Sequence, residues 1–133
     1  MKNYPIIISI IVLMTSCDKT TQVRNSTVDV AVLPHPKEIT ISENTLFLSS
    51  ESNIHSSQEE LQPLLQLFES EVKKLTGITI EPTKVKNQKA DIIFEIDSSL
   101  SEDEYYLNVD KTIQVTGGSY QALTMAKATL LQL

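Results

Sequence analysis

The chain has 133 residues, a net charge of −6, 41% hydrophobic residues and 21% charged residues, which is typical of one globular domain rather than of a disordered segment. Its Lys and Arg residues are scattered and form no cationic stripe, so no nucleic acid partner is expected. The single cysteine excludes a disulfide within the chain as a source of stability.

The N-terminus has the pattern of an export signal. Lys2 supplies a positive start, and residues 6–14 are apolar with one exception. This run is shorter than the roughly 20 apolar residues that span a bilayer, but it has the length of the apolar region of a signal peptide. The small residues just before Cys17 resemble the bacterial lipobox, in which the cysteine takes a diacylglycerol and becomes the new N-terminus.

We therefore predict a lipoprotein signal peptide over residues 1–16 and lipidation of Cys17. The lipid would anchor the exported chain to a bacterial membrane, on its periplasmic or cell-surface side. The alternative is an ordinary secretory signal with a chance cysteine. Residues 17–29 are rich in Thr, Asn, Asp and Ser, which predicts a flexible tether to a folded domain over residues 30–133.

The folded part opens with short extended segments. Leu33-Pro34-His35-Pro36 is extended because each proline fixes its own φ and disfavours helix in the residue before it. Residues 39–41 and 46–48 are predicted as two short strands around a turn at 42–44.

A first helix is predicted between a capping box at 57–60 and Gly77 as its C-terminal glycine. One helical face is apolar and carries Leu61, Leu64, Leu65, Phe68, Val72 and Leu75. Pro63 would break a helix that began at Ser57. We therefore place the start of the regular helix near Gln62, with Pro63 in its first turn, and interpret the leucine stripe as core.

Alternation of apolar and polar residues predicts the later strands. Residues 78–80 form a short strand, and 90–96 is the most apolar strand and hence expected to be central. Residues 105–109 and 113–115 form a hairpin with one apolar face around a turn at Asp110-Lys111.

A final helix is predicted after Gly117-Gly118, with Ser119 as its N-cap. Its apolar face would carry Tyr120, Leu123, Ala126 or Lys127, Leu130 and Leu133. The fold class is therefore α+β, a small mixed β-sheet with two α-helices packed on one face. The last helical carbonyls have no visible cap, so we expect a chain cut at a domain boundary.

Three stretches of the chain form a recognisable series. They are Leu33-Pro34-x-Pro36 with the two segments after it, Asp103-Glu104-Tyr105-Tyr106-Leu107-Asn108-Val109, and Thr129-Leu130-Leu131-Gln132-Leu133. In order and spacing they resemble the N-terminal, non-catalytic domain of glycoside hydrolase family 20, the β-N-acetylhexosaminidases. The first resembles the start of that domain, the second is similar to its E-x-Y-x-L-x-V strand, with Asp103 where Glu is usual, and the third matches the T-L-x-Q-L that ends its second helix.

The resemblance implies a domain that packs against a catalytic (β/α)8 barrel, in the same chain or encoded downstream, which these 133 residues do not contain. A related domain occurs in glycoside hydrolase family 84, and the residues do not separate the two families. The family 20 barrel carries an Asp-Glu pair in which Glu is the general acid and Asp positions the acetamido group of the substrate.

No catalytic residue, cofactor site or metal site is predicted in this chain. Asp103-Glu104 imitates the catalytic dipeptide but belongs to the strand motif, so we interpret it as a solvated turn. His35 and His55 are the only histidines, too few for a metal site without paired cysteines.

Three functions remain open from the sequence. The first is the accessory domain of an exported β-N-acetylhexosaminidase, inactive on its own. The second is a stand-alone surface lipoprotein that binds glycan, although Trp is absent and only four tyrosines are available. The third is a structural module that docks on a separately encoded partner.

Overall fold

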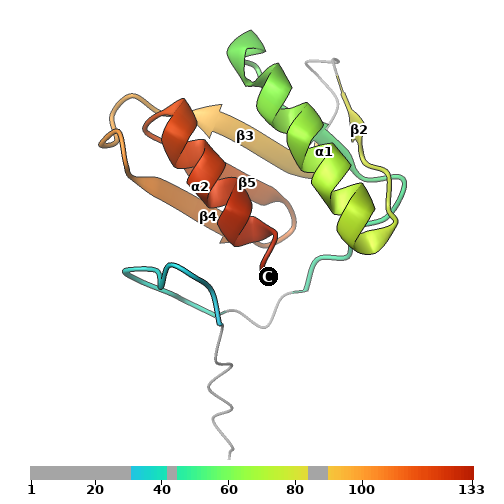
Figure 1. The fold of residues 1–133 in the computed structure, drawn as a ribbon, viewed down its shortest axis with the longest axis horizontal. Helices are drawn as coiled ribbons and strands as arrows, with labels where there is room; N and C mark the ends of the chain where they lie inside the picture. Colours follow the sequence, from blue (N-terminus) through green and yellow to red (C-terminus); the bar gives the residue numbers. More distant parts are fainter. Residues whose placement is uncertain (1–30, 42–44, 84–89) are drawn as a thin grey trace, which may run out of the picture.

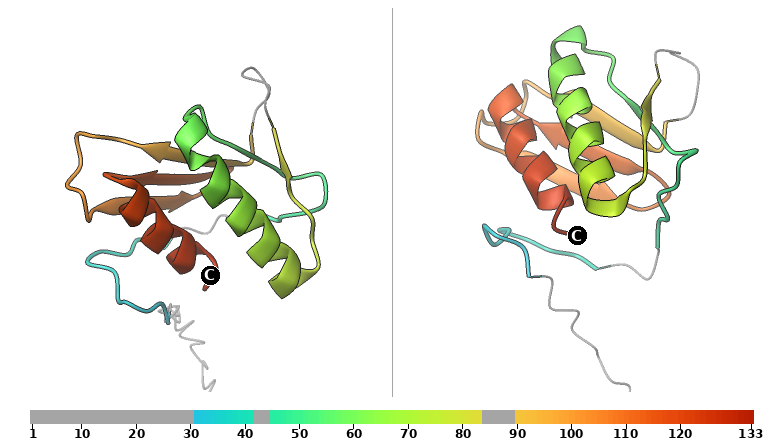
Figure 2. Two further views of the ribbon diagram at one scale, coloured as in Figure 1. Left: turned by 45° about the horizontal axis from the view of Figure 1, so that its top comes forward. Right: turned by 45° about the vertical axis from the view of Figure 1, so that its right-hand side comes forward.

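The computed structural model describes residues 31–41, 45–83 and 90–133, in which a five-stranded sheet carries two helices. Both helices lie on the same face of the sheet (Figure 1), and two further views show the same arrangement (Figure 2). The predicted α+β fold is therefore confirmed.

The sheet is mixed, with strand order β2-β1-β3-β5-β4. The strands are β1 (Asn53–His55), β2 (Glu81–Pro82), β3 (Ile92–Ile96), β4 (Tyr105–Val109) and β5 (Ile113–Gly117). β1 runs parallel to β2 and β3, and β3 runs parallel to β5, whereas β4 is antiparallel to β5. The predicted central strand and the predicted hairpin are both confirmed.

The first helix, α1 (Gln62–Thr76), follows a short 3-10 turn, η1 (Glu59–Leu61). Pro63 lies in its first turn, where a missing N–H costs no helical hydrogen bond. Gly77 ends the helix at φ 78°, a left-handed conformation that glycine adopts without strain. The predicted start and end of the helix are thus confirmed.

The prediction of a capping box at 57–60 is wrong. No side-chain capping bond is present at either η1 or α1, and the residue before α1 is Leu61. The physical reason is Pro63: it delays the regular helix until Gln62, so Ser57 lies too early to cap it.

The strands predicted at 39–41 and 46–48 are also wrong, because both segments lack strand structure. Leu46 and Leu48 pack against the core while Phe47 is 85% exposed. The alternating pattern at 46–48 therefore reflects packing of Leu46 and Leu48 against the core, without hydrogen bonding to a neighbouring strand. The strand predicted at 78–80 is displaced along the chain, since Ile80 is fully buried but pairing begins only at Glu81.

The second helix, α2 (Tyr120–Leu130), begins where predicted. Ser119 is extended, and its hydroxyl accepts a hydrogen bond from the backbone N–H of Ala122 at 3.1 Å. Both candidates for its inner face, Ala126 and Lys127, are buried. Tyr120 and Leu133 are 42% and 64% exposed, so their assignment to the core face is wrong. Tyr120 is the first helical residue and Leu133 lies beyond the helix end.

The expectation of uncapped carbonyls at the end of α2 is wrong as well. The carbonyls of Lys127, Thr129 and Leu130 accept backbone N–H groups from residues 131–133. The carbonyl of Ala128 accepts a hydrogen bond from the side-chain amide of Gln132 at 3.0 Å. Backbone N–H groups of the following turn and the side chain of Gln132 therefore provide hydrogen-bond donors for the last carbonyls of α2.

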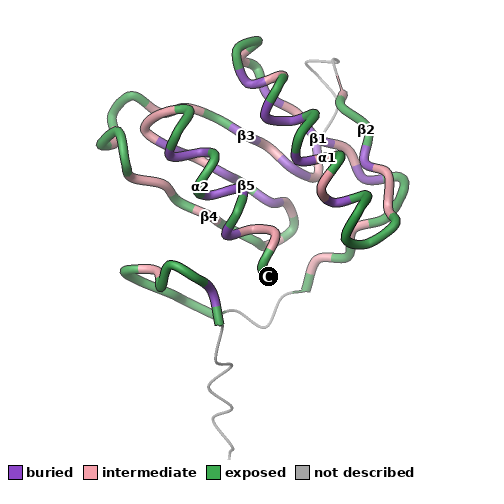
Figure 3. The backbone as a smooth tube through the Cα atoms, in the orientation of Figure 1, coloured by how far each residue is buried: buried purple, intermediate pink, exposed green. Residues whose placement is uncertain are grey.

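The core lies between the helices and the sheet, and Figure 3 shows the buried residues along the sheet-facing sides of both helices. It is built around Phe68 and Phe94, whose ring centroids are 5.5 Å apart. The predicted core residues Leu64 and Phe68 are each 1% exposed, which confirms them, whereas Leu130 is only partly buried.

The predicted signal peptide, tether and Cys17, and the turn at 42–44, lie outside the described residues and stay predictions. Within the described ranges, neither helix has the length and apolar character needed to cross a membrane.

Candidate functional site

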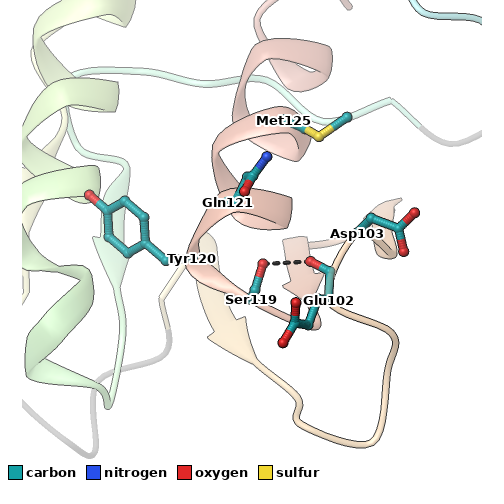
Figure 4. Close-up of a pocket in the computed structure, with 6 residues that line it drawn as sticks. All are labelled: Glu102, Asp103, Ser119, Tyr120, Gln121 and Met125. Carbon is teal, nitrogen blue, oxygen red and sulfur yellow. Dashed lines mark hydrogen bonds between the residues drawn. The ribbon is translucent and has the colours of Figure 1, made fainter.

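A hollow lies where the loop before β4 meets the start of α2. It has a volume of about 390 Å³ and is open to solvent. Its lining comprises Glu102, Asp103, Ser119, Tyr120, Gln121 and Met125 (Figure 4). To bind a substrate, the polar groups of this hollow would have to converge on one point.

Two hydrogen bonds occupy the hydroxyl of Ser119. It donates to the carbonyl of Glu102 at 2.5 Å and accepts from the N–H of Ala122. Figure 4 shows the ring of Tyr120 directed away from Glu102 and Asp103, toward the neighbouring helix, and the Asp103 carboxylate turned away from Ser119. The polar groups of the hollow therefore do not converge.

Gly118 brings the two walls of this hollow together. Its N–H donates to the carbonyl of Glu104 at 2.9 Å. A Cβ atom at this position would lie 1.9 Å from the carbonyl oxygen of Ser101, far inside van der Waals contact. The pair Gly117-Gly118, predicted only as the opening of a helix, thus also allows the loop before β4 to pack against the start of α2.

The Asp103-Glu104 dipeptide lies in that loop, with Asp103 exposed and Glu104 half-buried. One carboxylate oxygen of Glu104 accepts the hydroxyl of Tyr106 at 2.9 Å, and the other accepts the N–H of Ser101 at 3.3 Å. These contacts close the turn and fix the tyrosine. The side chain of Glu104 therefore serves its own loop and strand, as expected for a structural turn.

The same contact raises the pKa of Tyr106. The hydrogen bond to Glu104 is the main cause and the negative charge of that carboxylate adds to it, because both favour the protonated phenol. Tyr106 is 57% exposed. It lies on the sheet face opposite the helices, because its neighbours Tyr105 and Leu107 pack against the core and side chains alternate along a strand.

Neither histidine lines this hollow. The Nδ1 atom of His35 forms a hydrogen bond with the carbonyl of Pro36 at 2.8 Å, and that of His55 with the carbonyl of Thr83 at 3.1 Å. In residues 31–41, 45–83 and 90–133, no three His, Cys, Asp or Glu side chains gather in a way that could hold a metal ion.

Two polar contacts beneath the helices were not predicted. The ammonium of Lys127, whose side chain is 7% exposed, forms an ion pair with the carboxylate of Glu71 on α1. The hydroxyl groups of Tyr105 and Thr129 are hydrogen-bonded at 2.8 Å and link β4 to α2. The helical spacing had left Lys127 as a core candidate but offered no partner for it, since Glu71 is 56 residues away.

Comparison with known proteins assigns the fold to a family. The model of glycosyl hydrolase family 20, domain 2, matches residues 29–133. Among solved structures, the chain is similar to a GH20 exo-β-N-acetylglucosaminidase from Vibrio harveyi in complex with N-acetylglucosamine, with 25% identity and a TM-score of 0.68. An inactive mutant of that enzyme matches equally well.

The similarity covers 77% of this chain but only 16% of the Vibrio harveyi enzyme. The chain therefore corresponds to a small part of that protein's length. No curated protein matches the chain significantly.

Proposed function

Because this chain belongs to glycosyl hydrolase family 20, whose domain 2 it matches over residues 29–133, we propose that it is the accessory N-terminal domain of an exported β-N-acetylhexosaminidase. In this proposal a (β/α)8 barrel, in the same polypeptide or encoded downstream, hydrolyses terminal N-acetylhexosamine residues. The observation that carries the proposal is the family match, which covers the whole described fold. It also favours family 20 over family 84.

The geometry of the described residues supports an accessory role. Hexosaminidase chemistry requires a general acid held within reach of the glycosidic oxygen, in a pocket that encloses the sugar. The hollow beside α2 is open, its polar groups do not converge, and Glu104 is bonded to its own turn. Glu104 thus makes structural contacts, whereas catalysis would need this carboxyl group free.

An activity assay tests this proposal directly. Residues 17–133 alone should not hydrolyse a chromogenic N-acetylglucosaminide, whereas a polypeptide that also contains the downstream barrel should do so. Replacing the Glu of the barrel's Asp-Glu pair should abolish turnover. Hydrolysis by residues 17–133 that is lost in Glu104→Gln but kept in the matched control Glu102→Gln would contradict the proposal.

Export and lipid anchoring form the second part of the proposal and rest on the sequence of residues 1–17. The wild-type precursor should be processed and should take up labelled fatty acid, and Cys17→Ser should do neither. Processing without label in the wild type would indicate an ordinary secretory signal instead.

Glycan binding without hydrolysis is a second candidate, favoured by the sheet face that the helices leave uncovered. Tyr106 lies there with Thr116 directly opposite, and Asn108 lies opposite Gln114. An exposed aromatic ring beside amide and hydroxyl groups is suited to a sugar, which stacks its apolar face on the ring and donates and accepts hydrogen bonds around it.

Titration with chitin oligosaccharides, followed by NMR, tests this candidate. Binding should shift the amide signals of β4 and β5, and Tyr106→Ala should abolish the shifts. The matched control is Tyr120→Ala, which removes a comparably exposed tyrosine from the helix side. The absence of shifts in the wild-type protein would exclude this face as a glycan site.

A further inference from the structure

The side chain of Gln132 joins two parts of the molecule that are 99 residues apart in sequence. Its carbonyl oxygen accepts the backbone N–H of Leu33 at 3.0 Å, and its amide nitrogen donates to the carbonyl of Leu33 at 3.0 Å. The same nitrogen donates to the carbonyl of Ala128 at 3.0 Å, within the last turn of α2. One amide group therefore contacts both the end of a helix and the N-terminal segment (31–41).

This arrangement replaces strand pairing for a segment that has none. A glutamine amide presents one acceptor and two donors in a plane, so it can satisfy the N–H and the carbonyl of one residue together, as a neighbouring strand would. The three views show the segment running close to the C-terminal end of α2 (Figures 1 and 2).

Little else described in the structure holds this segment. The side chain of Leu33 is 78% exposed, and Ile39 and Ile41 are 41% and 51% exposed. Val32 is the exception, since it is only 3% exposed. Two adjacent residues of the segment are held most closely, Val32 by burial and Leu33 by the paired hydrogen bonds.

We propose that Gln132 acts as a clasp: its side chain couples the docked position of the N-terminal segment to the hydrogen-bonded conformation of the last turn of α2. The coupling arises because one side chain is shared: the bond to Ala128 orients the amide for Leu33, and the bonds to Leu33 hold it over the helix end. Such a coupling is reciprocal, so release of the segment loosens the turn and fraying of the turn releases the segment. The inference does not depend on the proposed function.

Amide hydrogen exchange on the full chain tests the clasp. In Gln132→Ala the N–H of Leu33 should exchange about tenfold faster, the effect expected from losing its acceptor and the bond beside it. The matched control is Gln121→Ala, an exposed glutamine in the first turn of α2 whose side chain has no hydrogen bond in the described structure, and it should leave Leu33 unchanged. Exchange at Phe94 in the central strand reports on global unfolding, so it gives the loss of overall stability, and Leu33 should accelerate by a larger factor than Phe94 in Gln132→Ala.

The reciprocal experiment releases the segment from its other attachment. Val32→Ser should accelerate exchange of the N–H groups of Leu131 and Gln132, which donate to carbonyls in the last turn, by a larger factor than at Phe94, which reports the loss of overall stability. Unaltered exchange at Leu33 in Gln132→Ala would overturn the clasp. Faster exchange at Leu33 with no response of the last turn to Val32→Ser would overturn the coupling.

Discussion

Helices α1 and α2 cover the same face of the sheet with different kinds of side chain. The residues buried on α1 are large and apolar: Leu64, Leu65, Phe68 and Val72. The residues buried on α2 are mostly small or polar: Ala122, Leu123, Ala126, Lys127 and Thr129. One helical layer is thus held by apolar bulk at α1 and by close approach with specific polar contacts at α2.

The close approach of α2 has a local cause in β5. A Cβ atom on Gly117 would lie 3.0 Å from the side chain and the backbone nitrogen of Leu123, so glycine leaves room for the helix to lie near the strand. Short side chains on α2 then bring Thr129 within hydrogen-bonding distance of Tyr105. We therefore expect α1 to depend on volume and α2 to depend on polar partners.

The largest effect is expected from removing volume beneath α1. Phe68→Ala should lower the free energy of unfolding by about 3–5 kcal/mol, because the ring is 1% exposed and packs against Phe94. The matched control on the same helix is Leu67→Ala, which removes a 47% exposed side chain and should cost far less. Urea denaturation measures both, and equal midpoints for the two variants would refute the volume argument for α1.

The ion pair between the helices should give an asymmetric result of intermediate size. Glu71→Ala leaves the buried ammonium of Lys127 without its partner and should cost roughly 2 kcal/mol. Lys127→Met leaves a carboxylate whose side chain is 32% exposed and can be solvated, so it should cost less than about 1 kcal/mol.

Thermal or urea unfolding at neutral pH measures this difference. If the lysine substitution were the more damaging of the two, the attachment of α2 would depend on the lysine chain itself rather than on the balance of charge.

A smaller effect than that of Glu71→Ala is expected at the start of α2. Ser119→Ala removes the hydroxyl that caps Ala122 and contacts Glu102 and should cost about 1 kcal/mol. Ser57→Ala is the matched control, because this serine precedes α1 without capping it. A measurable loss of stability from Ser57→Ala would restore the capping box that the structure excludes.

Much of the α1 side of the fold was predictable from neighbouring residues. The spacing of leucines, Pro63 in the first turn and the left-handed glycine at 77 each act within one or two helical turns. The hairpin and the central strand were predictable for the same reason, since alternation and turn residues are local signals.

The candidate site was less predictable. Asp103-Glu104 was correctly placed before a strand, but the contacts of Glu104 with Ser101 and Tyr106 depend on side-chain directions. The roles of Lys127 and Gln132 were missed because their partners lie 56 and 99 residues away. A lysine within an apolar helical face was the one available signal, and it indicated burial without identifying Glu71.

Both helices, the central strand, the hairpin and the α+β class follow from local sequence, because periodicity, caps and turn residues act over a few neighbours. Which of the other alternating segments became strands depends on tertiary contacts. Residues 46–48 alternate but remain unpaired, whereas Asn53–His55, which carried no clear signal, lies between β2 and β3. The physical reason is that a strand is completed by the hydrogen bonds of a neighbouring chain segment, and a local pattern does not specify whether such a neighbour is present.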